Sequence, residues 1–206
     1  MATITKNITQ STDDALTYNF ITWITEQVTS TTLLWELQNW WDEYWIIGRF
    51  QNITIPQWAT ITNAILRFTS ATTKTITYKE SQFWTDLNCT WYTIWVIETD
   101  NIWTFSNLWS IWAVWTVVNR TTSNSVVSNT EYTTTNISSL IQAVINRWGR
   151  SSWNSLALTV IPKPYNEYSN TWLEVYSYDW DPSKVMELEI TYDAPENNNW
   201  NFFAFF

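Results

Sequence analysis

The stretch IPQWATITNAILRF, residues 55–68, places a turn directly before a strand. From Ala59 onward apolar and polar residues alternate, which is the period of a strand with one buried face. Between Gln57 and Ala59 a tight reversal would usually take glycine, because such corners often need a positive φ. The sequence has Trp58 at this corner. The stretch therefore predicts a strand entered through a turn whose corner residue is unexpectedly large.

The same alternation recurs along most of the chain. Thr, Ser and Asn dominate the polar positions and β-branched residues the apolar ones, which is typical of strands. Short strands separated by turn residues predict an all-β fold, either an antiparallel β-sandwich or a barrel. The expected strands are residues 3–8, 32–37, 44–50, 59–68, 74–80, 92–98, 113–119, 155–161, 173–178 and 186–192.

One segment, TTTNISSLIQAVINR at 133–147, departs from this pattern. Its apolar residues have the spacing i, i+3, i+4, i+7, i+8, which marks one face of a helix. The spacing predicts a single amphipathic helix over about 137–147, packed across an end or edge of the sandwich. Asn136 or Ser138 is expected to cap its start, and Arg147 suits its last turn. The apolar residues are Ile137, Leu140, Ile141, Val144 and Ile145.

Length and charge limit the organisation and the partners. The 206 residues suffice for one sandwich domain, expected over 1–193, followed by an Asn-rich spacer and Phe-rich tail over 194–206. The net charge of −9 argues against nucleic acid and anionic membranes, because both require a basic surface. The first residues lack a charged and then apolar leader, so no signal peptide is expected. No stretch is long and apolar enough to predict a membrane span.

The residue types needed for common catalytic sites are scarce. The chain has no histidine and one cysteine, Cys89, which excludes His-dependent nucleophiles, histidine metal sites and an intrachain disulfide. Paired carboxylates remain, but a glycosidase needs a defined separation across a cleft, so no enzyme activity is expected. Turn acids such as Asp13, Asp14, Asp179 and Asp181 are candidates for a structural calcium ion. The pairs are Asp13 with Asp14, Glu36 with Asp42 and Glu43, Asp179 with Asp181, and Glu187 with Glu189.

The C-terminal segment DAPENNNWNFFAFF, residues 193–206, ends in four phenylalanines. Four exposed Phe side chains would promote aggregation, so we expect them to be buried on this subunit or on a neighbour. A short apolar extension after a polar spacer is suited to docking in another chain. The candidate oligomer contacts are Phe202, Phe203, Phe205 and Phe206.

Glycine and tryptophan are present in unusual numbers, with 2 Gly and 18 Trp. Average glycine usage is roughly 7%, far above the amount here. Several tryptophans also lie beside Asn, Asp or Ser, where turns usually place glycine. We interpret many of them as UGA codons that the organism reads as glycine; the alternative is a Trp-rich binding surface. Besides Trp58 these positions are Trp40, Trp153, Trp172, Trp180 and Trp200.

Four stretches resemble the DNRLRE-type β-sandwich domains. They are ITQSTDDA at 8–15, IPQWATITNAILRF at 55–68, ISSLIQAVINRWGRSSWNSLALTV at 137–160 and YSYDWDPSKVMELEITY at 176–192. In that family Trp58, Trp153 and Trp180 correspond to glycine. The chain departs from the family in IIGRFQNI at 46–53, which replaces its Arg-rich strand, and in Val185–Met186, which replaces Ala-Pro. The resemblance implies a jelly-roll-like antiparallel β-sandwich.

Members of that family occur in phage structural proteins, secreted adhesins and polysaccharide-active enzymes. We therefore expect a structural subunit of a surface assembly, most simply a phage virion decoration or fibre protein at the virion or extracellular surface. Its partners would be copies of itself or neighbouring virion or surface proteins. One alternative is a carbohydrate-binding module, with Tyr176 and Tyr178 as its candidate glycan face. Another is an extracellular filament subunit or adhesin.

Overall fold

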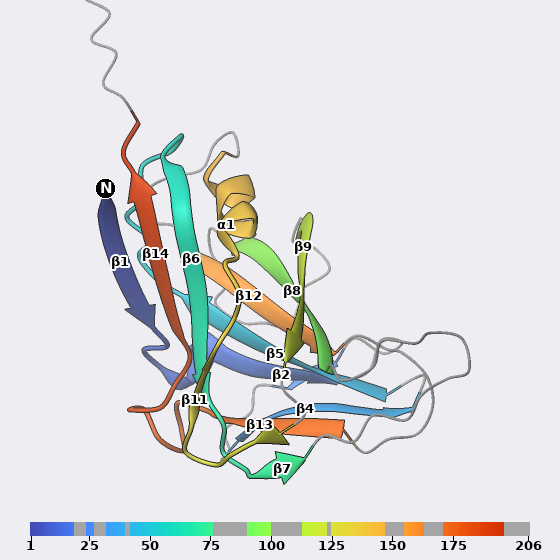
Figure 1. Cartoon of the computed structure of the whole chain (residues 1–206). Helices are drawn as coiled ribbons and strands as arrows, with labels where there is room; N and C mark the ends of the chain where they lie inside the picture. Colours follow the sequence, from blue (N-terminus) through green and yellow to red (C-terminus); the bar gives the residue numbers. More distant parts are fainter. Residues whose placement is uncertain are drawn as a thin grey trace, which may run out of the picture.

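The computed structural model describes residues 1–18, 24–26, 32–39, 42–75, 90–99, 113–122, 125–146, 155–162 and 171–195. These residues form antiparallel sheets and, among them, a single α-helix. The predicted all-β, sandwich-like fold is confirmed. The strands of the smaller main sheet run across those of the larger one (Figure 1).

The smaller sheet has four strands in the order β1-β14-β6-β11. Its alternation follows the sequence pattern, because Leu66, Leu188 and Ile190 are buried while Arg67 and Glu189 lie on the other face. The register pairs Leu188 with Leu66 across the sheet. Its strands are β1 (Ala2–Asn7), β14 (Glu187–Asp193), β6 (Thr60–Thr69) and β11 (Glu131–Thr133).

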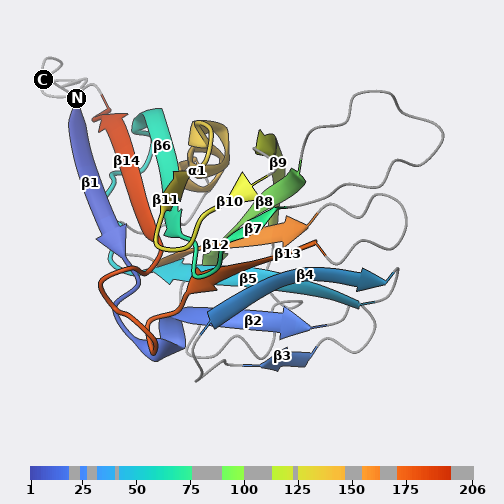
Figure 2. The same ribbon diagram turned by 60° about the horizontal axis from the view of Figure 1, so that its bottom comes forward.

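The larger sheet has the order β13-β4-β5-β12-β8-β9, and β2 also pairs with β5 and with β3. Figure 2 shows β13, β4, β5, β2 and β3 side by side below α1, with β8 and β9 to the right of the helix. A separate pair joins β10 (Ser125–Val126) to β7 (Lys74–Thr75). The larger sheet comprises β2 (Asp14–Tyr18), β3 (Ile24–Glu26), β4 (Thr32–Asn39), β5 (Asp42–Phe50), β8 (Thr90–Thr99), β9 (Ala113–Thr122), β12 (Ser155–Pro162) and β13 (Thr171–Tyr176).

Helix α1 (Ser138–Ile145) contacts β6, β8 and β9 and so bridges the two sheets. Its predicted apolar face is confirmed: Leu140, Ile141, Val144 and Ile145 are all buried. The N-cap position is Ile137, so neither predicted residue occupies it. Asn136, one residue earlier, still accepts a hydrogen bond from the Ser138 amide through Oδ1 at 2.8 Å. Arg147 lies outside the described residues. No described helix is long and apolar enough to span a bilayer.

One buried apolar cluster unites both sheets and the helix. Gly48, near the end of β5, is closely packed: a Cβ there would lie 2.8 Å from Met186 Cε and 3.3 Å from Ile8 Cδ1, so these two side-chain ends would have to shift. Residues wholly shielded from solvent include Phe50, Ile53, Ile55, Leu66, Ile137, Leu140, Ile141, Ile145 and Leu156.

The observed strands differ from the predicted ones, because β2, β3, β10 and β11 are not among the ten predicted strands. The strand expected over 173–178 ends at Tyr176, because Ser177 O accepts the amides of Trp180 and Asp181 and turns the chain. Trp172, which we expected at a turn, lies inside β13 opposite Glu36. The expected strand over 74–80 is described only at Lys74–Thr75.

Candidate functional site

A buried polar cluster lies where the 3₁₀ turn η1 (Ser11–Asp13) leads into β2. The register pairs Asp14 with Gly48, which brings the neighbouring residue Asp13 next to Arg49. Arg49 Nε donates to Asp13 Oδ1 at 2.6 Å, and Arg49 Nη2 forms an ion pair with the same oxygen. Gln51 Nε2 lies 2.8 and 2.9 Å from the two carboxylate oxygens, and Thr9 Oγ1 donates to Oδ2 at 2.9 Å.

Asp13 therefore has its charge and both its oxygens satisfied inside the protein. Asp13 and Arg49 are 0% and 7% exposed. A buried carboxylate held by a guanidinium and two neutral donors positions backbone segments and leaves no oxygen for a substrate. The cluster joins the N-terminal turn to the centre of the larger sheet.

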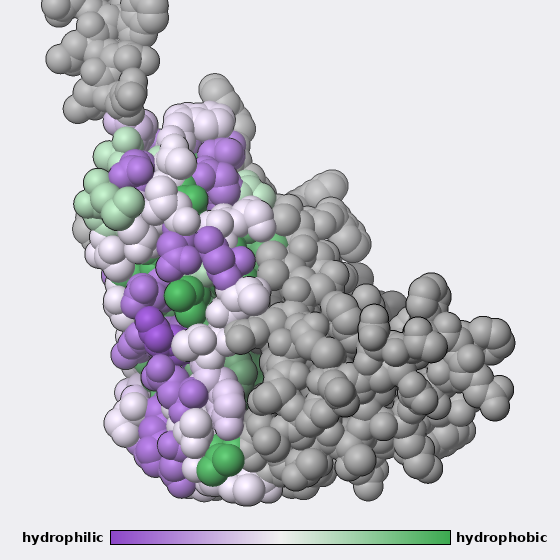
Figure 3. Space-filling model, in the orientation of Figure 1, coloured by the Kyte–Doolittle hydropathy of each residue, from purple (hydrophilic) through white to green (hydrophobic). Residues whose placement is uncertain are grey.

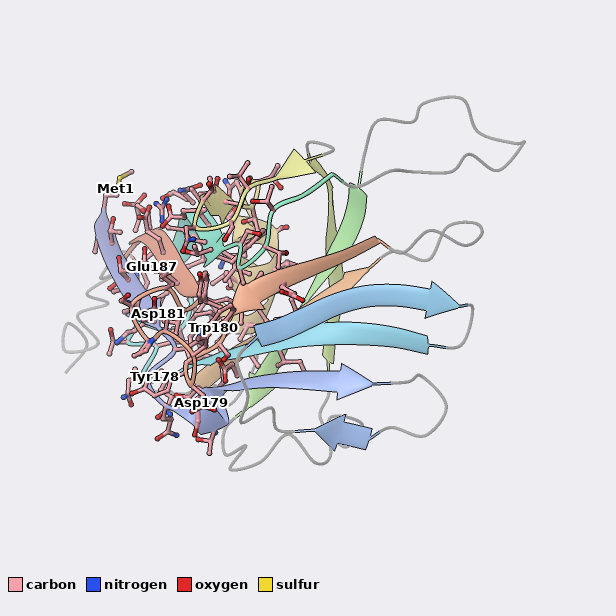
Figure 4. The ribbon with its side chains drawn as sticks, turned by 90° about the horizontal axis from the view of Figure 1, so that it is seen from below. Met1, Tyr178, Asp179, Trp180, Asp181 and Glu187 are labelled. Carbon is pink, nitrogen blue, oxygen red and sulfur yellow. The ribbon has the colours of Figure 1, made fainter. Side chains whose placement is uncertain are left out.

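Asp14, the next residue, is buried without a cation. The Tyr178 amide donates to its Oδ2 at 2.7 Å, whereas Oδ1 has no hydrogen-bond partner within the described chain. Burial raises the pKa of Asp14 to about 7, and the charges of Asp179 and Asp13 act in the same direction. Figure 4 shows Tyr178 and Asp179 beside the start of β2. Asp14 thus fastens the turn after β13 to β2.

The four candidate calcium ligands do not converge on one point. Among the described residues no group of three or more Asp, Glu, Cys or His side chains could hold a metal ion. The Asp13 carboxylate is bonded to Arg49. Asp181 Oδ1 accepts a hydrogen bond from Ser183 Oγ at 2.6 Å, and Asp181 Oδ2 forms an ion pair with Lys184 at 3.1 Å. The hydrogen bonds from Ser183 and Lys184 lower the pKa of Asp181. Asp181 therefore orders its own turn.

Tyr176 ends β13 and belongs to a second cluster, which joins this strand end to the loop after it and to the loop that contains Asn129. Its hydroxyl donates to Asn129 Oδ1 at 2.8 Å, and Lys184 Nζ donates to the same oxygen at 2.9 Å. Lys184 Nζ also lies 4.5 Å from the Tyr176 ring centroid, and the Trp180 ring lies 4.5 Å away. Tyr176 is only 7% exposed, and Tyr178 packs against the core. A glycan contact at either ring stays a prediction.

The outer face of the four-stranded sheet carries a charged group centred on Arg67. Its guanidinium lies 2.9 Å from Glu189, 3.3 Å from Glu187 and 3.6 Å from Glu131. Hydrophilic residues gather over this sheet in Figure 3. Glu187 and Glu189, paired in the sequence, share this partly exposed face, and Arg67 is the counterion that sequence pattern alone does not identify.

The two edges of this sheet are finished differently. Strand β11 pairs with β6 at residues 67–69, and side chains cover the same side of β6 before that point. Thr134 Oγ1 accepts a hydrogen bond from the Leu66 amide at 3.0 Å, and Asn136 Oδ1 accepts one from the Ala64 amide at 3.1 Å. Gln142 of α1 accepts the Ile61 amide at 2.7 Å and donates to Ala59 O at 2.9 Å. At the opposite edge, β1 pairs with β14 and with no other described strand.

Several candidate residues lie where their side chains are not described. Phe202, Phe203, Phe205 and Phe206 lie outside the described residues. The backbones of Glu36, Asp42 and Glu43 belong to β4 and β5, but their side chains are likewise outside the description. Their proposed roles stay predictions.

No protein-family model and no curated protein matches this sequence. The likeness to DNRLRE-type domains therefore depends on the four quoted stretches.

Proposed function

We propose that this protein is a non-enzymatic structural subunit of a surface assembly, of the kind that phage virions carry as decoration or fibre proteins. The Asp13 cluster is the observation that carries the proposal. Its acid, guanidinium and amide are the groups a catalytic or binding site would use, yet they are buried and bonded to one another. Their chemistry holds η1 against β5.

The other polar groups support the same role. Lys184, Asp181 and Asn129 fasten loops, and Arg67 balances glutamates on a sheet face. These interactions rigidify a small domain that must survive outside a cell. The net charge of −9 favours solubility and disfavours non-specific association before the domain binds its partner.

The site of assembly in this proposal is the apolar segment at 202–206. Sedimentation velocity of the full chain, compared with a variant lacking residues 196–206, tests the proposal directly. The full chain should form species larger than one chain, and the truncated variant should not. If the full chain stays single at every concentration, the proposed function is wrong.

A glycan array probed with the same full chain distinguishes the structural role from the alternative of a carbohydrate-binding module. Saturable binding that is lost in Tyr178→Ala, with an unchanged circular dichroism spectrum, would favour a carbohydrate-binding module. Mass spectrometry of purified particles would then place the protein on a virion or on a cellular filament.

A further inference from the structure

Building on the proposed function, we propose that the free edge of β1 is the acceptor for residues 202–206 of a second copy, which add to the four-stranded sheet as an extra strand. Strand β1 pairs with β14 along its whole length, from Ala2 opposite Tyr192 to Asn7 opposite Glu187. Its other side faces no described strand, and Figures 1 and 2 both show it at the outside of the sheet. Unpaired backbone groups on such an edge are a template for strand addition.

The contrast with the opposite edge supports this assignment. There, Thr134, Asn136 and Gln142 bond the backbone of β6 along residues 59–66, so an incoming strand would have to displace them. Backbone bonds from Thr134 and Ile137 to Leu66 and Ala64 complete that seal. Residues 59–66 of β6 are thus closed to an added strand, whereas the outer side of β1 is open along its whole length within the described chain.

The edge also has an apolar side that is only partly covered. Ile4 and Tyr192 pack against the buried core but stay half-exposed. A strand added beside β1 would place alternate side chains next to them. Phe202 and Phe206 alternate with Phe203 and Phe205, so either register directs two phenylalanines toward this side.

The donor starts close to the acceptor edge. Strand β14 ends at Asp193, beside the start of β1, and Pro195 prevents the strand from continuing because it has no amide to donate. Residues 196–201 then provide a polar spacer before FFAFF, whose five residues match Ala2–Lys6 in length. A tail returning to its own β1 would run parallel to it. A tail from another copy is free to pair antiparallel, which is the more stable arrangement.

Pairing of β1 with β1 of another copy is less favourable. If two β1 strands paired antiparallel with their inner faces on the same side, Lys6 of one copy would lie opposite Ala2 or Ile4 of the other. Lys6 is half-buried on that inner side. An inward-pointing lysine is a common protection against such edge-to-edge pairing. A donor made of Phe and Ala carries no second charge into this strip. Because donor and acceptor are different surfaces, the contact is head-to-tail and leads to a ring or an open chain of subunits.

Two matched substitutions on adjacent residues of β1 test the acceptor. Ile4→Lys puts a charge on the half-covered inner side, and Thr5→Lys puts the same charge on the outer face. The donor is tested by Phe202→Ser, Phe203→Ser, Phe205→Ser and Phe206→Ser together, called the tail variant. Circular dichroism and thermal melting confirm that each protein is folded, and sedimentation equilibrium gives its molar mass.

The wild type and Thr5→Lys should assemble, while Ile4→Lys and the tail variant should each have the mass of one chain. Mixing Ile4→Lys, which keeps its donor, with the tail variant, which keeps its acceptor, should give a one-to-one pair. The inference is overturned if Ile4→Lys assembles as Thr5→Lys does, or if the mixture gives no pair. In both cases an assembling wild type leaves the proposed function standing, whereas a wild type that never assembles refutes both.

Discussion

At the scale of single residues, Trp58 occupies a backbone position made for glycine. Its φ is 66°, and the Ala59 amide donates to Pro56 O at 3.2 Å across the turn. A Cβ in this left-handed region costs about 1–2 kcal/mol. The other non-glycine residues with positive φ in the described chain are Asn52 and Asn129, and asparagine tolerates this conformation. Glycine decoding thus has a conformational reason at Trp58. It has none at Trp172, which lies in β13, or at Trp180, whose φ is not positive.

Trp58→Gly should therefore raise the free energy of unfolding by about 1 kcal/mol, because strain is removed at a side chain that is 55% exposed. Urea denaturation followed by circular dichroism measures the change. Trp58→Ala is the matched control, since it removes the indole but keeps the strained Cβ, and should give no such gain. A destabilised Trp58→Gly would show that the indole, not the backbone, determines this turn.

Asp14 is the residue whose environment predicts a pH effect. Its pKa in the folded protein is raised to about 7 from an ordinary value of 3.8. A raised pKa means that the protonated form is favoured by folding, so stability falls as pH rises between about 4 and 7 and is level above. Asp14→Asn is neutral throughout and keeps an oxygen for the Tyr178 amide.

The stability of Asp14→Asn relative to wild type should increase over that window, by at most about 4 kcal/mol. Chemical denaturation at several pH values between 4 and 8 measures it. Asp179→Asn removes one of the neighbouring negative charges and should shift the upper end of the window to lower pH. Parallel pH profiles for Asp14→Asn and wild type would contradict the assignment.

At the scale of elements, α1 holds β6 through one side chain that imitates a neighbouring strand. Gln142 bonds both the Ile61 amide and Ala59 O, while its helical neighbours Ile141 and Ala143 make no such bond. Gln142→Ala should lower the free energy of unfolding by about 1–3 kcal/mol, because a half-buried amide and carbonyl lose their partners. Ser139→Ala, on the exposed side of the same helix, should leave it nearly unchanged. Equal stabilities for the two variants would mean that water replaces the glutamine.

Elements with a strong period could be predicted from sequence, and contacts between elements could not. Alternation in β6 and β14 and the helical face of α1 give their positions within one or two residues. Strands β10 and β11 have two and three residues, too few for a period to show. The Asp13–Arg49 pair depends on the register of β2 with β5, and Arg49 is 36 residues away in sequence.

The two tyrosines show the same limit at a boundary. Alternation over 173–178 suggests one face for Tyr176 and Tyr178, but the chain turns at Ser177. Their rings consequently have different surroundings: Tyr176 lies against Trp180, and Tyr178 against the core. The turn that separates the two rings is formed by hydrogen bonds to the Ser177 carbonyl. The residue types in this segment do not reveal that turn.

At the scale of the whole molecule, the two sides of the four-stranded sheet have opposite properties. The β6 side is sealed by α1 and the segment before it, and the β1 side is open within the described chain. In the proposed assembly this asymmetry makes the domain a head-to-tail building block, with β1 receiving the Phe-rich segment of a neighbour.

Hydrogen–deuterium exchange of the β1 amides, measured by mass spectrometry in the assembled wild type and in the tail variant, tests this claim most directly. The amides of residues 59–66 serve as internal reference, because their partners lie within the same chain. We predict that the amides of residues 2–6 that point away from β14 exchange slowly in the assembled wild type and much faster in the tail variant, while the reference amides do not change. Equal exchange of β1 in the two proteins would contradict the account.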